Sequence, residues 1–307
     1  MSESNKAYIG VDIGGTNLRG ALVLADGAIV SRFRTESAIA KGADSFLLRL
    51  EQHLLEMLKY GAARGIKVAG IGMGIPGLIN KAGKVSSSIN MQPLNGLGVA
   101  EIIQQRLGIP TKNGNDANMI ALGEATFGAG RGMRSLMVIT IGTGLGSGLI
   151  LDGTLWTGSD GYAAEFGHFT LLPDGLPCPC GNRGCLEQYV SSSALSRYGG
   201  GIPPEELGIA ADNGDQVALK AFRQLGVNLG TGLAGLLNLL NLDGIIIGGG
   251  VAGSFRHFEQ TILDTINERT FPAIAEKVIL RQSVLGDDAG LLGSALLIAD
   301  HLNKAKG

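Results

Sequence analysis

The chain twice runs through an apolar strand pattern, a glycine-rich turn and a second apolar strand pattern. The first copy, AYIGVDIGGTNLRGALVLADG, spans residues 7–27, and the second, SLMVITIGTGLGSGLILDG, spans residues 135–153. Both are typical of β-hairpins, and strands are predicted at 7–13, 18–24, 135–141 and 147–152. A chain of 307 residues is also long enough for two ordinary domains, so we expect two rather than one.

Glycine is abundant at such turns. The chain has 50 glycines, roughly twice the average usage of about 7%. A third glycine turn follows an apolar strand in IIIGGGVAG, residues 245–253. Backbone N–H groups free of side chains can surround phosphate oxygens, and threonine hydroxyls add donors. The turns therefore predict phosphate binding, and Asp12, at the end of the first strand, is a candidate magnesium ligand, directly or through water.

Two other phosphate-binding motifs are not supported. No segment matches a Walker A loop, because Gly83-Lys84 is followed by Val85. Gly248, Gly250 and Gly253 match the dinucleotide pattern, but the next predicted strand ends in Arg281 rather than in an acid.

All three cysteines lie within eight positions, in CPCGNRGC. Together with His168 they form the pattern H-x9-C-x-C-x4-C, which offers the four N and S ligands that a structural zinc ion takes. The predicted ligands are His168, Cys178, Cys180 and Cys185. The alternatives are three reduced thiols without a metal, or a catalytic zinc, which would keep a position open for water.

Charge and hydrophobicity argue against nucleic acid and membranes as partners. The net charge is −2 and no long run of like charge occurs, so no nucleic-acid surface is expected. The N-terminal segment MSESNKA lacks the apolar stretch of a secretory signal. Residues 225–242 are apolar enough to suggest a membrane span, but their asparagines and glycines favour a buried helix. We expect a cytoplasmic protein.

The motifs together resemble the ROK family of sugar kinases and repressors along nearly the whole chain. DIGGTNLRGALV, ITIGTGLGSGLI, IIIGGGVAG, EFGH and CPCGNRGCLE are the segments that carry the resemblance. It implies an α/β, actin-like ATPase (ribonuclease H-like) fold of two α/β domains with a cleft between them. The expected domains are 1–115, with a C-terminal helix from about 291–307, and 116–290. Family members are often homodimers or homotetramers.

The resemblance also implies roles for particular residues. Asp116 would be the general base; an ordinary helix N-cap is the alternative from the sequence pattern alone. The expected sugar-binding residues are Gly77, Asn90, Asn115, Asp116, Glu165, His168 and Glu187. The match at Asn90 is imperfect, because this chain has Asn90-Met91-Gln92-Pro93 where the family often has Asn-Leu-Pro-Gly-Trp.

The remaining implied contacts are to the nucleotide. They are Asp12, Gly14, Gly15, Thr16, Asn17, Gly142, Thr143, Gly144, Gly248, Gly249 and Gly250, with magnesium bound at Asp12 through water. LWTGSDGYAAEFGH and CGNRGCLEQY resemble the bacterial glucokinase branch, which implies Mg-ATP-dependent phosphorylation of the 6-hydroxyl of glucose. The alternatives are a kinase of N-acetylglucosamine, N-acetylmannosamine, fructose or allose. A sugar-binding regulator is a further alternative. Family repressors carry an extra N-terminal DNA-binding domain, and the short segment before the first predicted strand is not expected to hold one.

Overall fold

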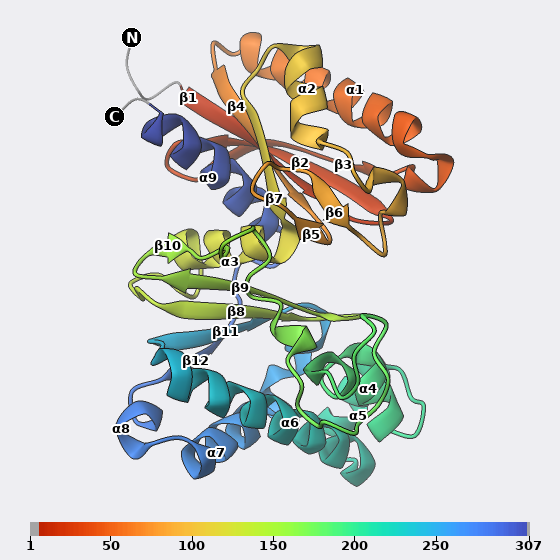
Figure 1. Ribbon diagram of the computed structural model, residues 1–307, viewed down its shortest axis with the longest axis vertical. Coiled ribbons are helices and arrows are strands. Elements are labelled where there is room, and N and C mark those ends of the chain that lie inside the picture. Colours follow the sequence, from red (N-terminus) through yellow and green to blue (C-terminus); the bar gives the residue numbers. More distant parts are fainter. Residues whose placement is uncertain (1–5, 306–307) are drawn as a thin grey trace. The chain divides into compact units, whose positions relative to one another are not determined.

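The computed structural model describes residues 6–305 and divides the chain into two α/β units (Figure 1). Unit 1 comprises Met1–Arg131, Leu155–Ala163 and Asp287–Gly307, and unit 2 comprises Gly132–Thr154 and Ala164–Gly286. The expected first boundary at residue 115 differs from this division, because the helix that begins at Asp116 packs along the C-terminal helix and so belongs to unit 1.

Unit 1 contains a five-stranded sheet in the order β3-β2-β1-β4-β7. Its strands are β1 (Lys6–Ile13), β2 (Asn17–Leu24), β3 (Ile29–Glu36), β4 (Lys67–Ile75) and β7 (Thr111–Asn115), and β5 (Leu78–Ile79) and β6 (Val85–Ser87) form a separate ribbon. Its helices are α1 (Ala43–Ala62), α2 (Val99–Leu107), α3 (Asp116–Phe127) and α9 (Asp288–Lys304), with 3₁₀ turns η2 (Ile39–Lys41) and η3 (Gln92–Leu94). Strands β1, β2 and β3 are antiparallel, whereas β1, β4 and β7 run parallel.

The two faces of this sheet bury different kinds of residue. Ile9, Val11 and Ile71 point into an apolar core that they share with Phe46 and Leu50 of α1. On the other face, every second position of β4 from residue 70 to residue 74 and one position in the middle of β1 hold glycine, and α9 lies directly on these strands (Figure 1).

Glycine is required at two of these positions. A β-carbon added at Gly10 would lie 1.9 Å from the carbonyl oxygen of Leu291, and one added at Gly72 would lie 1.7 Å from that of Ser294. Strand side chains alternate between faces, so a glycine at every second position lets a helix approach one face while the other stays apolar.

Unit 2 contains a second five-stranded sheet, in the order β10-β9-β8-β11-β12. Its strands are β8 (Leu136–Ile141), β9 (Leu145–Leu151), β10 (Thr154–Leu155), β11 (Gly244–Gly248) and β12 (Ile279–Gln282). Its helices are α4 (Ser192–Tyr198), α5 (Pro204–Asp212), α6 (Gln216–Leu240), α7 (Glu259–Arg269) and α8 (Pro272–Ala275), with 3₁₀ segments η4 (Phe166–His168), η5 (Leu186–Gln188) and η6 (Gly250–His257). Both predicted hairpins are confirmed, as β1–β2 and β8–β9.

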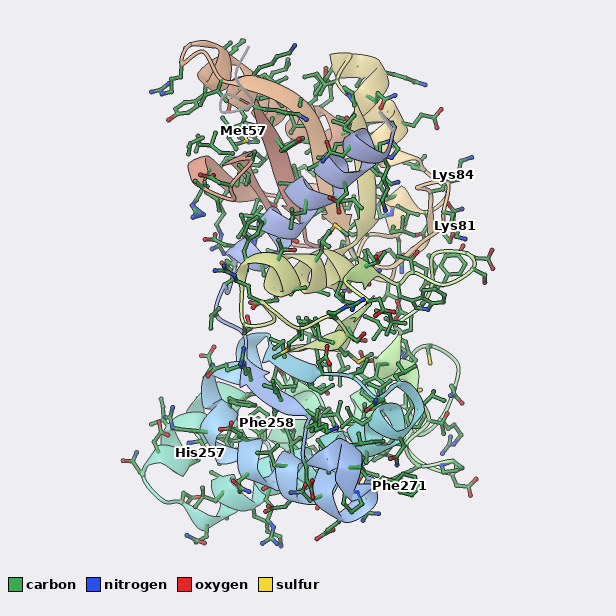
Figure 2. The ribbon with its side chains drawn as sticks, turned by 90° about the vertical axis from the view of Figure 1, so that its left-hand side faces the viewer. Met57, Lys81, Lys84, His257, Phe258 and Phe271 are labelled. Atoms are coloured by element: carbon green, nitrogen blue, oxygen red, sulfur yellow. The ribbon has the colours of Figure 1, made fainter. Side chains whose placement is uncertain are left out.

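The apolar stretch at 225–242 lies mostly in α6, whose buried face packs against α7. Phe222 stacks on Phe258 with ring centroids 6.1 Å apart, and Phe258, labelled in Figure 2, is fully buried. Across residues 6–305, none of the helices combines the length and the hydropathy that a bilayer span requires.

A short segment after β10 packs on the β5–β6 ribbon of unit 1, whose turn carries the two lysines labelled in Figure 2, Lys81 and Lys84. The backbone N–H of Lys81 donates to the carbonyl of Asp160 over 3.0 Å, and the hydroxyls of Ser86 and Tyr162 lie 2.6 Å apart. These contacts explain why residues 155–163 belong to unit 1 although the preceding strands belong to unit 2.

The close approach of α9 to β4 leads to a prediction. Gly72→Ala should lower the free energy of unfolding by roughly 3 kcal/mol, because the added methyl group forces α9 away from the sheet. Gly98→Ala in the same unit is a matched control, since the nearest atom to an added β-carbon is a carboxylate oxygen of the flexible Glu101 side chain, at 3.2 Å. It should cost less than about 1 kcal/mol by urea denaturation. Equal losses in the two variants would contradict the packing argument.

Candidate functional site

The carboxyl ends of β1, β4 and β7 meet at one edge of the unit 1 sheet, because the three strands are parallel neighbours. This edge brings together Asp12 near the end of β1, Gly77 just after β4, and Asn115 at the end of β7. Ligands of open α/β sheets bind outside the carboxyl ends of the strands. Three of the predicted site residues are therefore grouped where such a sheet binds its ligand.

Asn115 fixes the start of α3 at this edge. Its Oδ1 accepts from the backbone N–H of Asn118 over 3.0 Å, and its Nδ2 donates to the carbonyl of Gly77 over 3.0 Å. Asn115 is thus the N-cap, and Asp116 is the first residue inside the helix. The alternative of Asp116 as an ordinary N-cap is wrong, because the neighbouring amide takes that position.

Asp12 lies in an ion-pair network. Its Oδ2 is 2.5 Å from Nη2 of Arg19, and Nη1 of Arg19 is 2.5 Å from Oδ1 of Asp287. Burial raises the pKa of the Asp12 carboxyl, and the Arg19 guanidinium lowers it in part. Arg19 could have been found from the sequence, since it stands directly opposite Asp12 in the hairpin register. Asp287 could not, because it comes from the segment just before α9.

The first glycine turn is tight, and its tip is exposed to solvent. The N–H of Gly14 donates to the carbonyl of Asn17 over 2.8 Å, and Gly15 and Thr16 at the tip are exposed. Asn90 lies against Gly15, so the segment that departs from the family pattern is in contact with this turn. In that segment the backbone N–H of Ser88 donates to Oδ1 of Asn95 over 2.8 Å.

The second glycine turn, in unit 2, is held by Glu187. Oε2 of Glu187 accepts from the backbone N–H of Leu145 over 2.9 Å, and a β-carbon added at Gly144 would lie 2.5 Å from the same oxygen. The N–H of Gly142 donates to the carbonyl of Gly144 over 2.9 Å, with Thr143 between them. Glu187 thus contacts the turn as well as belonging to the expected sugar-binding set.

His168 and the three cysteines come together as a cluster. Each offers one ligand atom, and these atoms lie within 4.8 Å of one another. Nδ1 of His168 is 3.7 Å from Sγ of Cys178, and the Sγ atoms of Cys180 and Cys185 are 3.6 Å apart. A tetrahedral zinc ion with Zn–S bonds of about 2.3 Å holds its ligand atoms about 3.8 Å apart, so these four residues could hold one.

The thiols of the cluster influence one another's protonation. Burial and the neighbouring thiols raise the pKa of Cys185. A bound metal reverses this by stabilising the thiolate form. Because Nδ1 of His168 faces Cys178, the other ring nitrogen is left for a different partner.

Glu165 lies close to this cluster. Burial raises the pKa of Glu165, His168 lowers it and Glu187 raises it, so the three side chains are within electrostatic reach of one another. Unit 2 therefore brings together the three residues expected at the sugar from this part of the chain.

A cavity of about 570 Å³ opens in unit 2 beside the third glycine turn. Gly250 lines it, whereas Gly249, with φ +83°, packs against the backbone of Ile141. The other lining residues are Ser192, Leu195, Pro203, Pro204, Glu205, Gly208, Ile209, Asp212, Phe222, Val251, Gly253, Ser254 and Arg256. The sequence indicated the turn but not the cavity, because its walls come from α4, α5, α6 and η6.

Residues 8–301 match the ROK family. The chain belongs to this family. A glucokinase of Halalkalibacterium halodurans is 30% identical over 321 aligned positions, which cover 98% of this chain and 97% of the relative. A ROK family glucokinase from Streptomyces griseus, solved in complex with glucose and AMPPNP, is 33% identical with a TM-score of 0.79, covering 96% of this chain and 99% of that one.

The ROK family also includes regulators similar to this chain. A xylose repressor of Caldicellulosiruptor bescii is 32% identical over 97% of this chain and 79% of the repressor. The matches confirm the predicted family and, with the two α/β units, the predicted actin-like ATPase fold class.

The two hydrogen bonds of Asn115 lead to a prediction. Asn115→Ala should lower the free energy of unfolding by about 1–2 kcal/mol, because it removes both the helix cap and the contact to Gly77. Asn115→Ser keeps a capping oxygen but cannot reach Gly77, so it should recover roughly half of the loss in urea denaturation. A serine variant as unstable as the alanine variant would show that the cap contributes nothing.

Proposed function

We propose that this ROK protein transfers the γ-phosphoryl group of ATP to the 6-hydroxyl of glucose. Its class is an ATP-dependent sugar kinase, as its family and its glucokinase relatives show. The assignment to glucose is the finer step. The glucose assignment is supported mainly by the alignment of the chain with glucokinases over nearly its full length. The same chain has an acid at the start of α3, two glycine–threonine turns, and the group of Glu165, His168 and Glu187.

Asp116 acts as the general base in this proposal. Its carboxylate accepts the proton of the sugar hydroxyl while the hydroxyl oxygen bonds to the γ-phosphorus, and the bond from that phosphorus to the β–γ bridging oxygen breaks to release ADP. The hydrogen bonds of Asn115 support this role, because they fix the backbone at the residue before Asp116. Phosphoryl transfer depends mainly on such positioning and on electrostatic stabilisation.

The two exposed turns bind the phosphates in this proposal. Their amide groups and the hydroxyls of Thr16 and Thr143 donate to phosphate oxygens. Magnesium, bound near Asp12 through water, would neutralise part of the phosphate charge. Asp12 fits this role through its position at the edge of the sheet, where magnesium would share the carboxylate with Arg19.

The cavity beside Gly250 takes the adenosine part of the nucleotide. Its volume of about 570 Å³ falls in the usual range of small-molecule sites, about 300–1,000 Å³. It combines apolar walls, such as Leu195 and Phe222, with polar groups such as Asp212 and Arg256. This mixture suits a planar base joined to a hydroxylated ribose.

Glu165, His168 and Glu187 of unit 2 bind sugar hydroxyls in this proposal. Gly77, Asn90 and Asn115 keep the sugar-binding roles that the family resemblance implies for them. Carboxylates accept hydrogen bonds from hydroxyl groups, and the ring nitrogen of His168 that faces away from Cys178 can pair with one more. A structural zinc ion held by His168, Cys178, Cys180 and Cys185 would keep the two ends of this loop in place.

Two observations keep other sugars and a regulator as candidates. The residues that follow Asn90 depart from the family pattern, and this segment bears on which sugar fits. An N-acetylated hexose is therefore the second candidate substrate. The match to a xylose repressor makes a sugar-binding regulator the non-enzymatic candidate. Cytoplasmic location and assembly as a homodimer or homotetramer stay predictions, the latter testable by gel filtration.

The proposal is tested by measuring Mg-ATP-dependent ADP release with glucose, N-acetylglucosamine, N-acetylmannosamine, fructose and allose. We expect the highest kcat/KM for glucose. Asp116→Asn should fold normally but lower kcat at least about 100-fold, because an amide cannot take the proton. Asp44→Asn, in the first turn of α1, is the control and should leave kcat unchanged. A higher kcat/KM for an acetylated sugar than for glucose would change the assigned substrate. Turnover retained by Asp116→Asn would refute the role of Asp116 as general base.

Removing the metal gives a separate prediction. The purified protein should contain about one zinc ion per chain by elemental analysis. Stripping the zinc, or replacing Cys180 by serine, should raise the KM for the sugar and lower the Tm, while the KM for ATP changes less. Asn182→Ala removes a side chain that donates to Thr170 rather than to a ligand, keeps the backbone hydrogen bonds of that residue, and should retain the zinc. Unchanged sugar KM and Tm after complete removal would rule out this role of the metal.

A further inference from the structure

Ser37 lies directly beneath the first glycine turn, just after β3 ends at Glu36. Its side chain is buried, with 1% exposed. Its hydroxyl donates to the carbonyl of Gly15 over 2.7 Å, and its backbone N–H donates to the carbonyl of Thr16 over 2.9 Å. One residue from the neighbouring strand thus holds two successive carbonyls at the tip of the turn.

Holding these carbonyls also orients two amides. The peptide bonds of the described residues are all trans, so the N–H of each planar unit points away from its C=O. The carbonyls of Gly15 and Thr16 face Ser37, so the N–H groups of Thr16 and Asn17 face the opposite side. The tip is exposed, so the side away from Ser37 is accessible to a ligand.

The backbone next to Ser37 is held in an unusual conformation. Ala38 has φ +58° and ψ +15°, the left-handed region that residues with a β-carbon rarely adopt, and it is buried. The chain reverses here into η2, which leaves Ser37 pointing at the turn rather than continuing β3. Such conformations persist where the surrounding structure enforces them, often beside functional sites.

We infer that Ser37 is a positioning residue that orients the Thr16 and Asn17 amides for a phosphate group of the nucleotide. The inference rests on the proposed role of this turn in phosphate binding. Without the Ser37 hydroxyl the Gly15 carbonyl loses its part-buried hydrogen bond, and its peptide unit can rotate. The cost then falls on binding as well as on folding, since preorganised donors contribute only while their orientation is fixed.

The test compares the affinity of Ser37→Ala for Mg-ADP with its stability. Calorimetry should show an ADP dissociation constant raised about three- to tenfold, the range expected for one hydrogen bond. The KM for ATP should rise similarly, and the KM for the sugar should not. Ser294→Ala is the matched control: its buried hydroxyl also donates to a backbone carbonyl in unit 1, that of Val11 over 2.9 Å, away from the turn. It should lower stability without changing ADP affinity.

Two more variants separate the possible failures. Thr16→Glu places a negative charge on the exposed tip and should weaken ADP binding more than Ser37→Ala does. Weakening by Thr16→Glu but not by Ser37→Ala would overturn the inference and leave the turn as a phosphate site. If Thr16→Glu does not weaken ADP binding, both the inference about Ser37 and the proposed role of the turn in phosphate binding are wrong. If Ser37→Ala does not fold, Ser37→Cys keeps the volume with a weaker donor and should show the same loss of ADP affinity.

Discussion

The direct packing of α9 on the backbone of β1 and β4 is the contact on which unit 1 depends. Side chains normally keep a helix about 10 Å from a sheet, but glycine at Gly10 and Gly72 removes that spacer. The opposite face keeps its large apolar residues, so the sheet has a conventional core on one side and a backbone contact on the other. Since α3 packs in turn on α9, the position of Asp116 follows from the same contact.

The two candidate binding regions are built in different ways. In unit 1, the ends of parallel strands and hydrogen bonds to backbone carbonyls position the functional groups, as Asn115 and Ser37 show. In unit 2, a compact cluster of His168 and three cysteines gathers a loop that has little regular secondary structure. The residues next to Glu165 and Glu187, Phe166 and Leu186, are buried in the unit 2 core, which also holds this loop in place.

Much of this arrangement could be predicted from local pattern. The two hairpins follow from strand periodicity and turn glycines, and the cluster of His168 with the cysteines follows from their spacing. The pairing of Asp12 with Arg19 follows from the register of the first hairpin. The contacts of Asp287 and Ser37, the cavity beside Gly250 and the grouping of α3 with unit 1 depend on segments distant in sequence. No local pattern encodes which distant segments will meet.

The place of α9 in the chain has a consequence for how the protein is made. The strands β1 and β4 of unit 1 are synthesised before the segments of unit 2, and α9 is synthesised after them. Unit 2 can therefore fold while unit 1 still exposes the glycine face of β1 and β4. Completing unit 1 requires a contact between segments far apart along the chain, which slows its folding.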